Sequence, residues 1–270
     1  MSHSRPIHQA LRCGLLLLGL LASGAASADQ LADIKAVNRI RVAIINGLPN
    51  FSYQDPKLGF TGSDVDTAKL LAKDLGVAID FVYVANADRI DTLLSNKADI
   101  ILSALSITPE RERAISFSVP YSVIALVIGA PKKLQVTGYR DLVGKKVGVG
   151  RNTSNGAQLK QNTTGVDIVE YEDEHALLDG YVKRQFDIIS AQRADIDEVN
   201  RLAPDRPIEE KFIQREFEVA VGIRKSERSL REWINAWVAK NLGNGKLNTI
   251  YRRYHGQDLP ETVMPKALVR

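Results

Sequence analysis

Apolar and polar residues follow two different periods along this chain. Short apolar runs predict buried strands, and they occupy residues 39–45, 77–84, 100–102, 123–128, 146–149, 166–169, 186–190 and 216–223. Apolar residues at helical spacing predict amphipathic helices, at residues 63–76, 88–95, 154–161, 173–184, 193–202, 227–242 and 246–254. Strands that alternate with helices indicate an α/β fold of mostly parallel sheets, with ligands bound at the carboxyl ends of the strands.

The alternation of strands and helices occurs twice, which indicates two units. We expect the chain to cross between them near residues 126–129 and again near 219–222. Two crossings predict two lobes joined by a hinge.

Residues 1–28 have the features of a secretory signal peptide. Arg5 and Arg12 supply positive charge, residues 15–22 include a short apolar run, and residues 26–28 are small. This pattern predicts cleavage after Ala28. An uncleaved anchor is the alternative, although the apolar run is too short to span a bilayer.

Composition and net charge argue against several classes of function. The chain has 270 residues, of which 25% are charged and 44% are hydrophobic, as in a soluble globular protein. Loss of Arg5 and Arg12 lowers the net charge from +4 to +2, which is too small to indicate nucleic-acid binding. Cys13 is the one cysteine of the sequence, so the mature protein is expected to have no disulfide and no cysteine-bound metal.

Residues 99–121, DIILSALSITPERERAISFSVPY, contain the clearest candidate site. A strand at 100–102 leads through a polar turn to Thr108, which is expected to cap a short helix that starts at Pro109. Arg111 falls in the first turn of that helix, and Ser63 and Gly76 are expected to cap and end the helix at 63–76. A small-residue loop beside an arginine suits a carboxylate.

Four segments in the same order resemble those of one protein family. They are GFTGSDVDTAK at 59–69, RIDTLLS at 89–95, SITPER with FSVPY between 106 and 121, and GKLNTIY at 245–251. The chain resembles the periplasmic amino-acid-binding proteins (solute-binding protein family 3) that supply ABC importers. This resemblance implies the two-lobe, type II periplasmic-binding-protein fold. The first lobe would comprise residues 29–126 and 222–270, the second lobe residues 127–221, and the ligand cleft would lie between them.

The resemblance assigns roles to residues of the first lobe. Arg111 matches the arginine that pairs with the α-carboxylate of the ligand, and Ser106 matches a hydroxyl that contacts the ligand. Ala104 matches a position that offers its backbone carbonyl to the α-ammonium. An exposed first-turn arginine and a loop serine bonded to its own backbone are the alternatives.

Other matched positions carry a second interpretation. Thr153 and Ser154 stand where the second lobe reaches the ligand carboxylate, although they also suit a plain helix cap. Arg89 matches an arginine of members that take acidic amino acids. The alternative is a solvated helix arginine paired with a nearby aspartate.

Three positions depart from the family pattern and leave the ligand open. Gln192 stands where the family often has the aspartate that binds the α-ammonium. A neutral amide cannot neutralise a buried ammonium, so either another carboxylate serves or the ligand is not an ordinary α-amino acid. Leu48 and Asn86 stand where many members place aromatic rings around the ligand side chain.

The resemblance therefore implies a non-enzymatic binding component of an ABC transporter. It would capture a small polar or acidic amino acid, or an amino-acid-like carboxylate, in the periplasm and deliver it to permease subunits. We expect a monomer that needs no cofactor and no metal. The alternatives are a periplasmic dehydratase of the cyclohexadienyl or arogenate type on the same fold, which needs a general acid in the cleft, and a sensor that docks on a signalling receptor.

Overall fold

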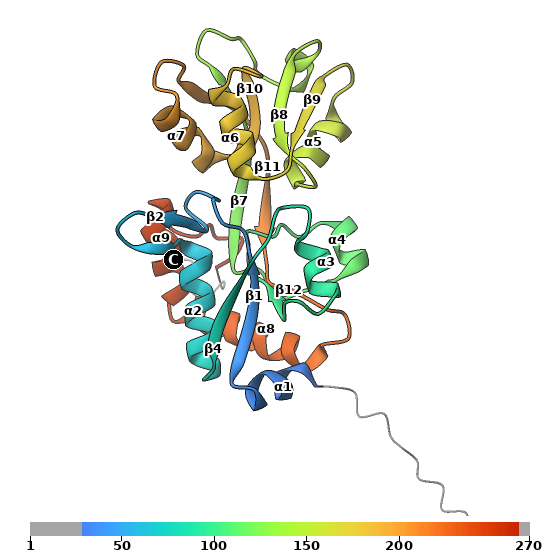
Figure 1. The fold of residues 1–270 in the computed structure, drawn as a ribbon, viewed down its shortest axis with the longest axis vertical. Helices are drawn as coiled ribbons and strands as arrows, with labels where there is room; N and C mark the ends of the chain where they lie inside the picture. The colour runs from blue at the N-terminus through green and yellow to red at the C-terminus, as the bar shows by residue number, and fades with distance from the viewer. Residues whose placement is uncertain (1–28, 265–270) are drawn as a thin grey trace, which may run out of the picture.

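The computed structural model describes residues 29–264, which form two lobes, one above the other in Figure 1. The predicted signal peptide at 1–28, including Cys13, lies outside the described residues. Each lobe contains a five-stranded sheet with helices packed against it. The predicted α/β class is confirmed.

The first lobe is built around a sheet with the strand order β4-β1-β5-β12-β6. Its strands are β1 (Arg39–Ile44), β4 (Ala78–Tyr83), β5 (Ile100–Ile101), β6 (Ser116–Phe117) and β12 (Gly222–Ile223). Its helices are α1 (Gln30–Ala36), α2 (Ser63–Leu75), α3 (Arg89–Leu94), α4 (Pro109–Ala114), α8 (Arg228–Gly243) and α9 (Lys246–His255). A small ribbon of β2 (Tyr53–Asp55) and β3 (Gly59–Thr61) lies beside α2 and α9.

The second lobe is built around a sheet with the strand order β11-β7-β10-β8-β9. Its strands are β7 (Ser122–Pro131), β8 (Lys146–Gly150), β9 (Asp167–Tyr171), β10 (Ile188–Gln192) and β11 (Ile208–Val219). A 3₁₀ turn, η1 (Tyr139–Leu142), precedes β8. The helices α5 (Ser154–Asn162), α6 (Glu174–Val182) and α7 (Arg193–Leu202) pack against the sheet.

Two antiparallel strands, β7 and β11, connect the lobes (Figure 1). Along β7 the side chains change from one hydrophobic core to another: Leu126 packs in the core of the first lobe and Val127 in that of the second. On β11, Ile208 packs in the second lobe and Phe217 in the first. The chain therefore passes from one lobe to the other on two neighbouring strands. The residue boundaries of the lobes stay a prediction.

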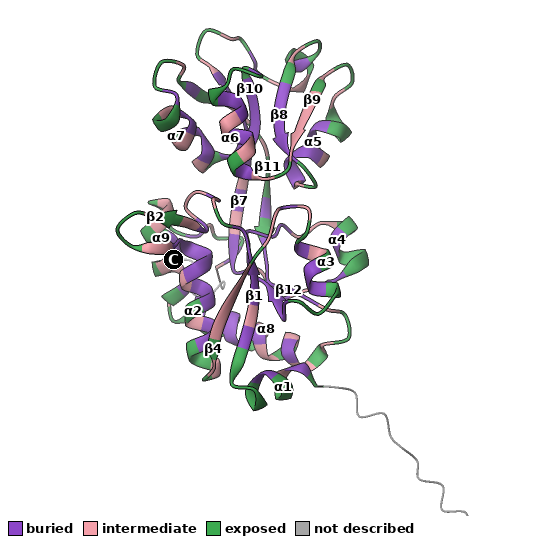
Figure 2. Ribbon diagram, viewed as in Figure 1, coloured by how far each residue is buried: buried purple, intermediate pink, exposed green. Residues whose placement is uncertain are grey.

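Burial follows the layers of each lobe. Figure 2 shows buried residues along the strands and the inward faces of the helices, and exposed residues on the outward faces. Within residues 29–264, no helix is long and apolar enough to cross a membrane. The same residues contain no group of three or more His, Cys, Asp or Glu side chains that could hold a metal ion.

Some sequence expectations need correction. The N-cap residue of α2 is Gly62, not Ser63. No side chain fits at Gly62, because its φ is 134° and it lies close to the backbone of Phe51. Ser63 instead places its hydroxyl 3.0 Å from Nε2 of His255. The sheets are mixed rather than mostly parallel, because β7, β11 and β12 pair antiparallel with their neighbours.

Candidate functional site

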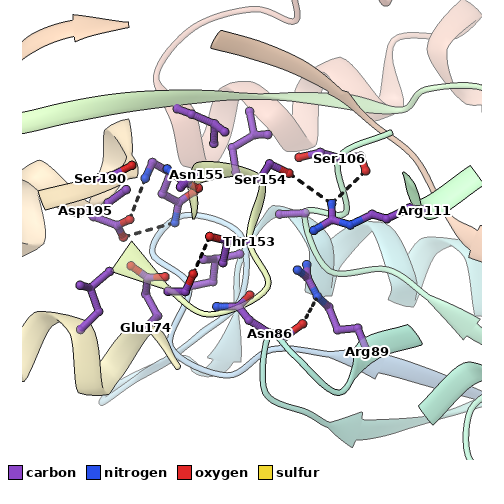
Figure 3. Close-up of a pocket in the computed structure, with 18 residues that line it drawn as sticks. Asn86, Arg89, Ser106, Arg111, Thr153, Ser154, Asn155, Glu174, Ser190 and Asp195 are labelled. Carbon is purple, nitrogen blue, oxygen red and sulfur yellow. Dashed lines mark hydrogen bonds between the residues drawn. The ribbon is translucent and has the colours of Figure 1, made fainter. Parts of the chain in front are cut away.

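All nine predicted site residues line one cavity of about 40 Å³ between the lobes (Figure 3). They are Leu48, Asn86, Arg89, Ala104, Ser106, Arg111, Thr153, Ser154 and Gln192. Four further polar residues of the second lobe also line it: Asn155, Glu174, Ser190 and Asp195. The structure thus brings together residues that are more than a hundred positions apart in the sequence.

Arg111 connects the two lobes at this cavity. Thr108 caps α4 by accepting a hydrogen bond from the Arg111 backbone N–H (3.3 Å), as predicted. The guanidinium donates from Nη1 to the Ser106 carbonyl (3.0 Å) and to Ser154 Oγ (3.3 Å), and from Nη2 to the Asn152 carbonyl (3.4 Å). Burial lowers the pKa of Arg111 to about 10, so the group stays charged at neutral pH.

Arg89 is buried at the same end of the cavity and is not a solvated helix residue. Its Nε donates to the Asn86 carbonyl (3.1 Å) and its Nη1 to the Ser103 carbonyl (2.9 Å). Burial, together with the charge of Arg111, lowers the pKa of Arg89 to about 9. Two fixed positive charges therefore form one end of the cavity.

A buried carboxylate supports the loop between these arginines. Asp64 accepts the Ala104 N–H at Oδ2 (2.6 Å) and the Tyr121 hydroxyl at Oδ1 (2.7 Å). Ala104 has a left-handed φ of 44°, which is uncommon for a residue with a side chain. Burial raises the pKa of Asp64 to about 7 in spite of both hydrogen bonds. Asp64 therefore holds Ala104 in a conformation that a free loop would not favour.

Thr153 and Ser154 lie at the amino terminus of α5. The Thr153 hydroxyl accepts from the Gly156 N–H (3.2 Å) and donates to the Gly150 carbonyl (2.7 Å), so it acts as a helix cap. Ser154, the first helical residue, turns its hydroxyl to Arg111 instead. The one O–H donor of Thr153 is therefore already used within its own loop.

Gln192 lies at the opposite end of the cavity, on the second lobe. Its backbone N–H donates to Asp195 Oδ2 (3.0 Å), and its side-chain Nε2 donates to Asp195 Oδ1 (3.3 Å). Nε2 also reaches the Pro49 carbonyl of the first lobe (3.4 Å). The amide thus orients a carboxylate that the sequence analysis did not identify.

Glu174 is the second carboxyl group at this end. Three consecutive acidic residues, 172–174, indicate a solvated face by local sequence alone, but Glu174 is only 6% exposed. Figure 3 shows its carboxyl group beside that of Asp195 at the same side of the cavity. Burial and the neighbouring Asp195 raise the pKa of Glu174 well above its usual range, and burial raises that of Asp195 to about 6.

The helical spacing of apolar residues indicates that Glu174 and Asp195 lie on buried faces of their helices. Glu174 stands three, four and seven positions before Leu177, Leu178 and Tyr181, which form the buried stripe of α6. Asp195 adjoins Ile196 on the buried face of α7. A carboxylate on an apolar stripe is costly unless it has a partner, so it marks a candidate site.

Several buried polar atoms at the cavity have no hydrogen-bond partner among the described residues. They are Asn86 Nδ2, Asn155 Nδ2, Glu174 Oε1 and Gln192 Oε1. Unpaired buried donors and acceptors cost free energy, so two donors and two acceptors are available to a polar ligand here. The apolar part of the wall is aliphatic, with Leu48 where an aromatic ring is common in the family.

The charges of the site are separated. Figure 3 shows Glu174 and Asp195 on one side of the cavity and Arg111 and Arg89 on the other, with Thr153 and Asn86 between them. A buried cavity with a positive and a negative end favours a ligand with the opposite arrangement of charges.

Comparisons with known proteins show the family and the fold of the chain. Residues 40–257 match the family model described as bacterial extracellular solute-binding proteins, family 3. The L-cystine-binding protein TcyJ of Escherichia coli is 27% identical over 247 residues, which cover 90% of this chain and 92% of TcyJ. The crystal structure of the solute receptor for L-cysteine of Neisseria gonorrhoeae superposes with a TM-score of 0.77 at 27% identity, covering 88% of this chain and 98% of that one. The predicted two-lobe binding-protein fold is confirmed.

Some of the similar proteins are enzymes by name. Cyclohexadienyl dehydratase of Pseudomonas aeruginosa is 35% identical over 119 residues, which cover 43% of each chain. This match covers less than half of the fold.

Proposed function

Because the chain belongs to the bacterial extracellular solute-binding proteins, family 3, we propose that it binds an α-amino acid for an ABC importer. The observation that carries this proposal is the charge-separated cavity, with Arg111 and Arg89 at one end and Glu174 and Asp195 at the other. A zwitterion fits this arrangement in one orientation only.

In this orientation, the α-carboxylate of the ligand lies against Arg111. A guanidinium fork can bind two carboxylate oxygens and keeps its charge when dehydrated. The Ser106 hydroxyl and the backbone N–H groups at the start of α5 would complete the carboxylate site. The α-ammonium then points toward Glu174, Asp195 and the unpaired Oε1 of Gln192, and the Ala104 carbonyl is available to it from the first lobe.

Arg89 would select the ligand side chain. Arg89 lines the cavity, and Asn86, whose carbonyl accepts from Arg89 Nε, adds an unpaired donor, Nδ2. These donors favour a side chain that ends in a carboxylate or amide oxygen. The ligand class that we propose is therefore polar or acidic.

Closure of the lobes would trap the ligand. Arg111 bonds to Ser154 and Gln192 bonds to Pro49 across the cleft. Contacts that exist only in the closed form are the ones that favour closure. We propose that the ligand adds to them and that the closed protein, a periplasmic monomer exported by its signal peptide, then docks on the permease.

Thermal melting of residues 29–270 against a ligand panel tests the function. The panel holds the common L-amino acids, L-cystine, D-amino acids, small dicarboxylates and prephenate. A ligand at a hundred times its Kd adds about 2.7 kcal/mol of stability, which gives a clear shift. Stabilisation by an acidic or amide-bearing L-amino acid is the expected result. Stabilisation only by ligands without a free α-amine would contradict the proposal.

A dehydratase is the second candidate, and one observation favours it. Glu174 is a buried carboxyl group with a raised pKa in the cleft, as a general acid requires. Incubation with prephenate, followed by chromatography, tests this function directly. Turnover that Glu174→Gln abolishes would support the enzyme, whereas prephenate recovered unchanged would reject it.

A further inference from the structure

We propose that Glu174 and Asp195 form the cation-binding subsite of the cavity and share one proton there until the ligand ammonium displaces it. The inference rests on the proposed amino-acid function and adds that ligand capture releases a proton. The two carboxyl groups replace the aspartate expected at Gln192.

The placement of the pair favours a shared proton. Both side chains are buried and line the same cavity, and Figure 3 shows them beside each other. Two neighbouring carboxylates in a buried site cannot both ionise at low cost, so one of them holds a proton. Asp195 accepts N–H groups of Gln192 at both of its oxygens, which favours its ionised form. Glu174 is therefore the group that carries the proton.

The surroundings do not neutralise the pair in any other way. On the second lobe the charged groups that face it are also acidic, Asp173 toward Glu174 and Glu198 toward Asp195. Among residues 29–264, no Lys, Arg or His forms a salt bridge with either carboxyl group. Arg89 and Arg111 lie at the far end of the cavity and donate to backbone carbonyls there.

The pair has a free oxygen for the ligand. Glu174 Oε1 and Gln192 Oε1 line the cavity, are buried and lack a partner among the described residues. A ligand ammonium can donate to both oxygens. Its positive charge then replaces that of the proton: the Glu174 O–H bond breaks, both carboxyl groups become ionised, and the proton leaves to solvent.

The exchange of the proton for the ligand ammonium determines how affinity depends on pH. Because the empty pair holds one proton and the complex holds none, lower pH favours the empty form. Affinity should therefore fall by up to about tenfold for each unit that the pH is lowered through neutrality. Burial raises the pKa of Asp195 to about 6, so a second proton would weaken binding further below that pH.

Isothermal titration calorimetry on residues 29–270 measures the released proton. L-Glutamate, L-aspartate, L-glutamine, L-cystine, L-cysteine and L-arginine are the probes, in phosphate and in Tris at pH 7. Because the two buffers differ in ionisation enthalpy, the difference in binding enthalpy gives the number of protons. We expect about one proton released for each ligand bound.

Matched variants locate the proton. Glu174→Gln keeps the shape and a donor toward Asp195 but has no proton to release, so it should bind at least about tenfold more weakly and show no buffer dependence. Glu172→Gln changes an exposed acid two positions away and should keep the proton release of the natural protein.

The outcomes separate the two proposals. A probe that binds with no proton release at pH 7 overturns the shared-proton pair and leaves the binding function standing. Binding by none of the probes contradicts the amino-acid function itself. If Glu174→Gln does not fold, the buffer comparison on the natural sequence still decides.

Discussion

The two ends of the cavity differ in whether their buried charges are constant. At the first-lobe end, Arg111 and Arg89 donate to backbone carbonyls, and their charges are fixed. At the second-lobe end, Glu174 and Asp195 face each other with no salt-bridge partner among residues 29–264. One end holds permanent charge, and the other holds charge that depends on its occupant.

The difference follows from the chemistry of the side chains. Burial lowers the pKa values of both arginines only to about 10 and about 9, so they stay protonated at neutral pH. Burial raises carboxyl pKa values toward neutrality, where protonation can change. The same dehydration therefore leaves the cationic end constant and makes the acidic end adjustable.

Among the variants considered, removal of the Arg111 guanidinium should weaken ligand binding most. Arg111→Ala should weaken binding of the best panel ligand by about 2–5 kcal/mol, because the ligand carboxylate stays buried without its partner. Titration calorimetry gives the affinity, and circular dichroism checks the fold. Arg113→Ala, an exposed arginine on the same helix, is the control. Unchanged affinity in Arg111→Ala would refute the carboxylate clamp.

Changing Arg89 should alter selectivity more than overall affinity. In Arg89→Gln, affinity for L-glutamate and L-aspartate should fall by about 1.5–3 kcal/mol, the value of a hydrogen bond to a charged group. Affinity for L-glutamine should change less, which makes it the internal control in the same titrations. An equal loss for all three ligands would mean that Arg89 supports the loop through the Ser103 carbonyl and does not select the side chain.

The support beneath the cationic end can be tested through Tyr121. Tyr121→Phe removes one of the donors to Asp64 and should cost about 1–3 kcal/mol of unfolding free energy. The folded-state pKa of Asp64, about 7, lies above that of an exposed aspartate. This group therefore contributes less stability as pH rises from about 4 through 7.

The cost of Tyr121→Phe should accordingly be larger at pH 8, where Asp64 is ionised and needs the donor, than at pH 5. Urea denaturation at both pH values measures it. Tyr83→Phe, on an exposed tyrosine of β4, is the matched control. A loss independent of pH would show that the hydroxyl acts by packing alone.

Ser154 should give the smallest effect. Ser154→Ala removes the hydroxyl that Arg111 contacts across the cleft, which should weaken ligand binding by about 0.5–1.5 kcal/mol. Ser226→Ala, on an exposed loop serine, provides the control in the same titration. Tighter binding in Ser154→Ala would mean that this bond competes with the ligand for Arg111.

The sequence by itself determined the order of the main strands and helices and one end of the site. Thr108 and Pro109 start α4 and place Arg111, because capping and proline geometry act within a few residues. Gly76 ends α2 in the left-handed conformation for the same local reason. The sequence did not predict α1, nor the strands β2, β3 and β6, which have only two or three residues each.

Only the tertiary structure decided the other end of the site. Glu174 follows exposed Glu172 and precedes exposed His175, so local sequence suggested a solvated cluster. Its burial depends on α6 packing toward Asp195 of α7, with the first lobe covering the cavity. Dehydration of a carboxyl group is set by what surrounds it in three dimensions, whereas a helix start is set by its neighbours in the chain.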